Sequence, residues 1–242
     1  MNLILLENDS PCQTLDAEDR RTRHVLDVLM RDGKDLFFVG LRDGRMGKAS
    51  PFELPDGALQ LRVDWSLPEA DALAPLEMVI GLPRPQSARR ILRDLPTMGI
   101  RKACFFVGGK GESGYATSSL WKTDEWTTQL REGVEQSFNP RFPDVSMADS
   151  LETALSQVSS TFCRIALDLY EAEQPYMQAL VQGGAACGVT LAIGPERGWN
   201  SNERGLLRSA GFVMCSMGAR VMRSDTAVIA AASVWNALNP KS

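Results

Sequence analysis

Hydrophobic runs divide most of the chain into short, nearly continuous apolar segments separated by amphipathic ones. Runs of this kind are typical of strands that are covered on both faces, as in a parallel sheet. From about residue 75 onward they predict strands at 76–82, 103–107, 164–169, 189–194 and 212–216. One intervening helix has its apolar residues at i, i+3, i+4 and i+7, namely Ala88, Ile91, Leu92 and Leu95. The pattern therefore predicts an α/β protein with a mostly parallel sheet.

Two further helices can be read from their ends. Asn200 is followed three residues later by Glu203, which predicts a capping box, and Gly211 is placed to end that helix. Ser224 is predicted to cap the last helix. The buried stripe expected along that helix consists of Ala227, Ala231, Val234, Trp235 and Leu238.

The first 70 residues have a different pattern. Residues 36–41 form an apolar run between Asp-Gly turn signals at 32–33 and 43–44, and residues 58–65 form a second strand-like run. A linker is expected at 69–75. We therefore predict a small β-rich domain over 1–70 and a larger α/β domain over 71–242.

Composition adds limits on the class of protein. The chain has 242 residues, 44% of them hydrophobic, and a formal net charge of −4. Its start has no basic region and only a short apolar run, and nothing approaches the roughly 20 apolar residues of a membrane span. We expect a cytoplasmic protein without a membrane partner. The cysteines form no CxxC pair and there is one histidine, so no metal is expected.

The acidic balance argues mildly against nucleic acid, but the arginines are clustered. One cluster lies at residues 20–24 and another at 84–93. A local basic face can bind RNA while the rest of the surface stays acidic. The candidate RNA contacts are Arg21, Arg23, His24, Arg84 and Arg89.

Two glycine-containing strings follow predicted strands. LAIGPERGWN covers residues 191–200, and SMGARVMRSDTAV covers residues 216–228. Ligands of open α/β sheets usually bind at the carboxyl ends of strands, so the two loops together predict a ligand cleft. Arg223 and Asp225 lie beside the second loop, at the start of the last helix. In isolation, either loop is also compatible with a plain strand–turn–helix connection.

These strings resemble the C-terminal signature of the SPOUT methyltransferases, and specifically of the ribosomal RNA small-subunit methyltransferase E family. That family reads GPEGG, then LG, then LRTETA. Residues 21–40, 81–106 and 131–145 resemble further segments of the family. The chain departs from this pattern in both loops: Arg197 replaces a glycine, and Ser224 and Asp225 replace threonine and glutamate. Two further departures lie earlier in the chain, where Thr97 and Met98 replace glutamate and leucine, and Ser87 lies near the position of a lysine.

The resemblance implies a SPOUT-type sheet with a C-terminal trefoil knot and a PUA-like N-terminal β-barrel that helps to hold RNA. It implies a homodimer that binds S-adenosylmethionine and acts on the 16S ribosomal RNA of the small subunit. The residues implied to bind the cofactor are Ile193, Gly194, Pro195, Glu196, Gly198, Met217, Gly218, Val221 and Met222.

The expected reaction is methylation of the N3 nitrogen of a uridine. Arg223 is the candidate for stabilising negative charge on the uracil oxygens, and Asp225 for orienting Arg223 or the base. Three alternatives remain open from the sequence. They are a non-catalytic RNA-binding protein on the same fold, a SPOUT methyltransferase with another RNA target, and an α/β protein that binds a nucleotide or phosphate through the glycine loops.

Overall fold

The computed structural model describes residues 3–30, 36–183 and 187–239. The chain forms two compact units. The first contains the described residues up to Ala72 together with Val134–Phe142, and the second contains Leu73–Gly133 and the described residues from Pro143 onward. The turn predicted at residues 32–33 lies outside the described residues.

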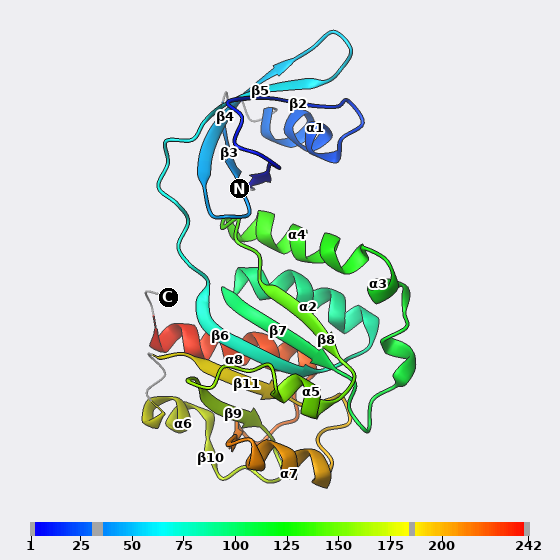
Figure 1. Ribbon diagram of the computed structural model, residues 1–242, viewed down its shortest axis with the longest axis vertical. Coiled ribbons are helices and arrows are strands. Elements are labelled where there is room, and N and C mark those ends of the chain that lie inside the picture. The colour runs from blue at the N-terminus through cyan, green and yellow to red at the C-terminus, as the bar shows by residue number, and fades with distance from the viewer. Residues whose placement is uncertain (1–2, 31–35, 184–186, 240–242) are drawn as a thin grey trace. The chain divides into compact units, whose positions relative to one another are not determined.

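The first unit is built on a curled five-stranded sheet with the strand order β1-β3-β4-β5-β2 (Figure 1). Its pairings are antiparallel except for β1 with β3. The strands predicted at 36–41 and 58–65 are confirmed as β3 and β5. The elements are β1 (Ile4–Leu5), β2 (Cys12–Leu15), α1 (Arg20–His24), the π-helix η1 (Val25–Leu29), β3 (Phe37–Gly40), β4 (Met46–Glu53) and β5 (Leu59–Asp64).

A segment far along the chain completes this unit. The amide of Leu3 donates to the carbonyl of Glu135 at 3.0 Å, and Arg20 forms an ion pair with the Glu135 carboxylate at 2.7 Å. The sequence pattern did not associate residues 134–142 with the first 70, because contacts over such a separation leave no local periodicity.

The second unit contains a seven-stranded parallel sheet with the order β10-β12-β9-β11-β6-β7-β8 (Figure 1). The predicted α/β class with a parallel sheet is confirmed, and all five predicted strands are present. The pattern missed two more, β8 and β10. The strands are β6 (Ala74–Gly81), β7 (Ile100–Phe106), β8 (Asp144–Ala148), β9 (Cys163–Leu167), β10 (Gln174–Pro175), β11 (Val189–Ile193) and β12 (Val213–Ser216).

Helices cover both faces of this sheet. Val79, Cys104 and Phe106 belong to a buried cluster with residues of α5 and α7. Since side chains alternate along a strand, the intervening residues face the layer that contains α2 and α8. The helices are α2 (Pro85–Thr97), η3 (Ser113–Tyr115), α3 (Ser119–Lys122), α4 (Glu125–Ser137), α5 (Leu151–Leu155), α6 (Tyr176–Gln182), α7 (Ser201–Ser209) and α8 (Ser224–Leu238).

The predicted face of α2 is confirmed, since Ala88, Ile91, Leu92 and Leu95 are all fully buried. Burial of each of the three larger side chains stabilises the fold by about 1.5–3 kcal/mol relative to exposure. The stripe predicted for α8 was only partly right. Ala231 and Trp235 are buried, but Leu238 is 39% exposed, and Val228 and Ala232 are buried in its place. The buried face is therefore set by packing against α2 and β11.

Candidate active site

Three loops meet at the carboxyl ends of neighbouring strands in the large sheet, because β12, β9 and β11 lie side by side and run parallel. Residues that follow these strands line a single cleft of about 730 Å³. The loops after β11 and β12 are the two that the sequence predicted. The loop after β9 was missed, although it contributes Asp168, Leu169 and Tyr170 to the lining.

The structure brings most of the predicted site residues together here. All nine cofactor candidates line the cleft, and so do Arg84 and Arg223. Asp225 lies just beyond it, in the first turn of α8. Arg21, Arg23 and His24 belong to α1 of the first unit, and Arg89 lies on α2.

The loop between β11 and α7 is held by close packing. A Cβ on Gly81, at the end of β6, would lie 2.4 Å from the backbone nitrogen of Pro195, so only glycine permits this approach. The indole Nε1 of Trp199 donates to the carbonyl of Leu167 at 2.9 Å, and its ring stacks on Phe106 at 5.8 Å. The loop is therefore fixed to β6, β7 and β9 at once.

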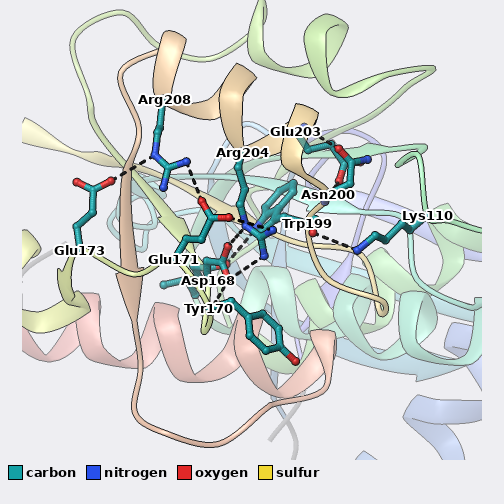
Figure 2. A network of polar contacts seen from close by, with 11 residues as sticks. Lys110, Asp168, Tyr170, Glu171, Glu173, Trp199, Asn200, Glu203, Arg204 and Arg208 are labelled. Atoms are coloured by element: carbon teal, nitrogen blue, oxygen red, sulfur yellow. Dashed lines mark hydrogen bonds and ion pairs between the residues drawn. The ribbon is translucent and has the colours of Figure 1, made fainter.

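The start of α7 ties further segments together (Figure 2). The capping box predicted from Asn200 and Glu203 is confirmed, with both hydrogen bonds at 2.8 Å. The buried Glu203 carboxylate also accepts from the amide of Gly109 at 2.9 Å, and Lys110 Nζ donates to the carbonyl of Trp199 at 3.3 Å. The segment after β7 is thereby bound to the helix that follows β11.

A buried ion pair fixes the loop after β9 to the same helix (Figure 2). Arg204 donates to the carboxylate of Asp168, and the two side chains are only 11% and 3% exposed. The amide of Tyr170 also donates to Asp168 Oδ1, at 2.8 Å. Burial raises the pKa of Asp168, but the hydrogen bonds from Arg204 and the Tyr170 amide outweigh it and hold the pKa below its ordinary value. Farther along α7, Arg208 pairs with Glu171 and Glu173 at the surface, at 2.9 and 3.5 Å.

The loop between β12 and α8 is open toward the cleft. Gly218 has a φ of +108°, which favours glycine, and a Cβ built there would meet no atom within 4 Å. The N-cap of α8 is Arg223, without a side-chain capping bond, so the prediction that Ser224 caps this helix was wrong. Ser224 is the first helical residue and is buried. Within the described part of the chain, neither Arg220 nor Arg223 forms an ion pair.

Asp225 has a different neighbour from the one expected. Its carboxylate is 9% exposed, accepts from Arg90 Nη1 of α2 at 3.2 Å, and also accepts from the amide of Thr226 at 3.0 Å. The geometry therefore gives no support to the expectation that Asp225 orients Arg223, because the carboxylate is directed toward the packed helix α2. Nearby, burial and then the charge of Asp225 raise the pKa of Asp94.

The other arginines predicted to bind RNA have carboxylate partners in the fold. Arg21 pairs with Asp19 at 2.7 Å and donates to the carbonyl of Leu5, while Arg23 pairs with Glu18 at 2.9 Å. Arg89 is half-buried against Glu125. These contacts give Arg21 and Arg89 structural roles, and RNA binding by all three remains a prediction.

Two observations concern other classes of site. Among the described residues, His, Cys, Asp and Glu side chains nowhere gather in groups of three or more that could hold a metal ion. In the same part of the chain, every helix is too short or too polar to cross a bilayer.

Residues 70–236 match the family described as RNA methyltransferase domain. A relative from Treponema pallidum, ribosomal RNA small subunit methyltransferase E, is 33% identical over 97% of this chain and 90% of its own length. Ribosomal RNA small subunit methyltransferase E 1 of Borreliella burgdorferi is 24% identical, over 97% of both chains. A ribosomal RNA small subunit methyltransferase E from Neisseria gonorrhoeae, solved with bound S-adenosyl methionine, has the same fold, with a TM-score of 0.75, 21% identity and coverage of 98% of both chains.

The match over residues 70–236 defines the class of the protein, which is the RNA methyltransferases. Within that class, the identity and coverage of the relatives are decisive. The chain belongs to the ribosomal RNA small subunit methyltransferase E family. The resemblance read from the two glycine loops is confirmed.

Proposed function

We propose that this chain transfers a methyl group from S-adenosylmethionine to N3 of a uridine in 16S ribosomal RNA. The observation that carries the proposal is the single cleft at the ends of β9, β11 and β12. The names of the relatives support small-subunit ribosomal RNA as the substrate. The cofactor of the Neisseria structure supports the methyl donor.

The residues of the cleft fit this cofactor. A volume of about 730 Å³ falls within the usual range for small-molecule sites. Gly198 and Gly218 leave the backbone of both loops open to close approach by a ligand, because a Cβ built at either position would meet no atom within 4 Å. The residues that would hold the cofactor are the nine that the family signature indicated: Ile193, Gly194, Pro195, Glu196, Gly198, Met217, Gly218, Val221 and Met222.

When bound, S-adenosylmethionine supplies an electrophilic methyl group on its sulfonium. The protein has to position the uracil ring and stabilise the charge that appears as N3 loses its proton. That charge is shared with the ring carbonyl oxygens. Arg223 lines the cleft without an ion pair among the described residues, so its planar set of N–H donors is available to one of these oxygens.

The proposal extends to the rest of the molecule. We propose that residues 1–70 act as a PUA-like RNA-binding barrel, and that residues 71–242 form a SPOUT domain whose C-terminal loops make a trefoil knot. The curled sheet of the first unit and the parallel sheet of the second support these assignments.

Gly218→Val is expected to weaken S-adenosylmethionine binding about tenfold or more. The added side chain projects into the cleft at a backbone φ that costs a β-branched residue about 1–3 kcal/mol. Calorimetric titration measures the affinity. Gly205→Ala is the control, because it adds a methyl group to the exposed face of α7 with no atom within 4 Å. Full affinity in a folded Gly218→Val variant would remove this loop from the site. A wild-type protein that does not bind the cofactor would overturn the function.

We also propose a homodimer. Trp235 on α8 is only 1% exposed and packs inside the single chain, so it is not available to a second copy. Ile229 and Leu238 on α8 are each 39% exposed, and Val221 is 75% exposed, so apolar surface remains for a second copy. Light scattering at micromolar concentration is expected to give the dimer mass. A fully active monomer would contradict this.

A further inference from the structure

The cleft differs in charge from the chain as a whole. Four arginines line it, Arg84, Arg197, Arg220 and Arg223, against the two carboxylates Asp168 and Glu196. Asp168 is buried and already neutralised by Arg204. The cleft therefore has a positive balance in a chain whose formal net charge is −4. Such a local field attracts an anionic ligand.

The arginines are available to an incoming ligand. Arg220 and Arg223 form no ion pair within the described residues. Arg197 pairs with Glu112 at 3.1 Å, but the side chains are 70% and 55% exposed, and Arg84 is 3.8 Å from Glu196 in a similarly exposed pair. Exposed pairs of this kind contribute little stability, so a phosphate can replace the carboxylate at small cost.

Tyr170 adds an aromatic surface to the same cleft. It is 77% exposed, more than any other large hydrophobic side chain in the described part of the chain. Its backbone is nevertheless fixed, because the Tyr170 amide donates to the buried Asp168 carboxylate, and Arg204 and Arg208 hold the next residue, Glu171. Figure 2 shows the ring directed away from these ion pairs. A buried ion pair therefore holds the backbone of Tyr170 in place, while the ring of Tyr170 remains exposed to solvent.

An exposed ring on a rigid backbone beside several arginines is the combination that binds single-stranded nucleic acid. Bases stack on the aromatic face, and the phosphates bind the guanidinium groups. We infer that Tyr170 stacks on a base of the RNA substrate and that Arg197 and Arg220 bind its phosphates. The uridine is therefore presented from a single-stranded segment. This inference rests on the proposed function, because it names how the RNA reaches that cleft.

S-adenosylmethionine is the other ligand that Tyr170 and Arg220 could contact, through its adenine ring and its carboxylate, although its net charge at neutral pH is positive. Two measurements separate the ligands. Fluorescence anisotropy gives the affinity for a labelled, uridine-containing single-stranded RNA, and for the same RNA annealed to its complement. Calorimetry gives the affinity for S-adenosylmethionine alone.

Tyr170→Ala is expected to weaken binding of the single strand by about 5- to 150-fold, the range measured for the loss of one stacked base. Tyr170→Trp should restore it, because the indole also stacks. The duplex should bind no better to wild type than to Tyr170→Ala, since its bases are already stacked. Calorimetric affinity for the cofactor should be the same in all three proteins.

Arg197→Gln and Arg220→Gln should each reduce the salt dependence of binding to the single-stranded RNA. The expected change is about 0.7 in the slope of log K for RNA binding against log salt concentration, for one lost phosphate contact. Lys102→Gln is the matched control. It also removes one positive charge, but Lys102 lies near the amino end of β7, whereas the cleft lies at the carboxyl ends of the strands. Its salt slope should equal that of wild type.

Unchanged affinity of Tyr170→Ala for the single strand would overturn the inference. So would a loss of cofactor affinity with RNA binding intact, which would assign the ring to the cofactor. The proposed function is tested separately, by methyl transfer from wild-type protein to small ribosomal subunits. That assay measures catalysis, whereas the role of Tyr170 is tested by the ratio of the RNA affinities of wild type and Tyr170→Ala. Failure of the proposed function can therefore be told apart from failure of this inference.

Discussion

Replacing Arg223 by alanine is expected to lower the rate of methyl transfer by about 10²–10³-fold, the usual effect of removing one preorganised donor to a developing oxyanion. Affinity for S-adenosylmethionine should change little, because the interaction forms only as N3 loses its proton. Arg223→Lys should restore only part of the rate, since an ammonium group cannot reproduce the planar donors of a guanidinium. Single-turnover methylation of small ribosomal subunits measures the effect.

Asp225→Asn is the informative companion. Because the Asp225 carboxylate is bound to Arg90, this variant should keep most of the wild-type rate. A loss as severe as that of Arg223→Ala would show that Asp225 takes part in proton transfer. A near-normal rate in Arg223→Ala would exclude Arg223 from the chemistry and leave the cofactor site unaffected.

The second large effect concerns stability. Arg204→Met leaves the Asp168 carboxylate buried without its cation, and breaking a buried pair in this way typically costs about 3–5 kcal/mol. Urea unfolding at neutral pH measures the free energy of unfolding. Arg208→Met is the control on the same helix. Its ion pairs are about 40–50% exposed, so it should cost no more than about 1 kcal/mol.

The effect of Arg204→Met should depend on pH. The pKa of Asp168 is lowered by folding, so the stability that it contributes is complete above its unfolded value of about 3.8 and is lost as the pH falls through the folded value. The difference between wild type and Arg204→Met should therefore narrow in strong acid. The double variant Arg204→Met with Asp168→Leu should recover stability, because no unpaired charge remains. An equal loss in Arg208→Met and Arg204→Met would show that burial of the pair is unimportant.

The elements that the sequence predicted share a local signal. The helix α2 was visible in its 3.6-residue period, the capping box in the spacing of Asn200 and Glu203, and the five central strands in their unbroken apolar runs. Both glycine loops were visible for the same reason, since each follows a buried strand directly.

Most of the features that were missed depend on contacts between distant segments, and the cap of α8 was missed by one residue. Nothing in the sequence around Asp168 and Tyr170 marks a ligand loop, because this segment contains no glycine. The ion-pair partner of Asp168, Arg204, lies 36 residues away along the chain. Ser224 looked like a helix cap, but the chain becomes helical at that residue, and Arg223 takes the N-cap position. Asp225 was assigned to Arg223 on sequence proximity, whereas the packing of α8 on α2 brings it to Arg90.

The way α7 is built bears on which substitutions this chain can tolerate. Asn200 and Glu203 hold the segments after β7 and β11, and Arg204 holds the segment after β9. A substitution that moves any of these three segments therefore also disturbs the same short stretch of helix. Ser201, Asn202, Gly205 and Ser209 are exposed on α7, and substitutions at these positions should leave the three segments in place.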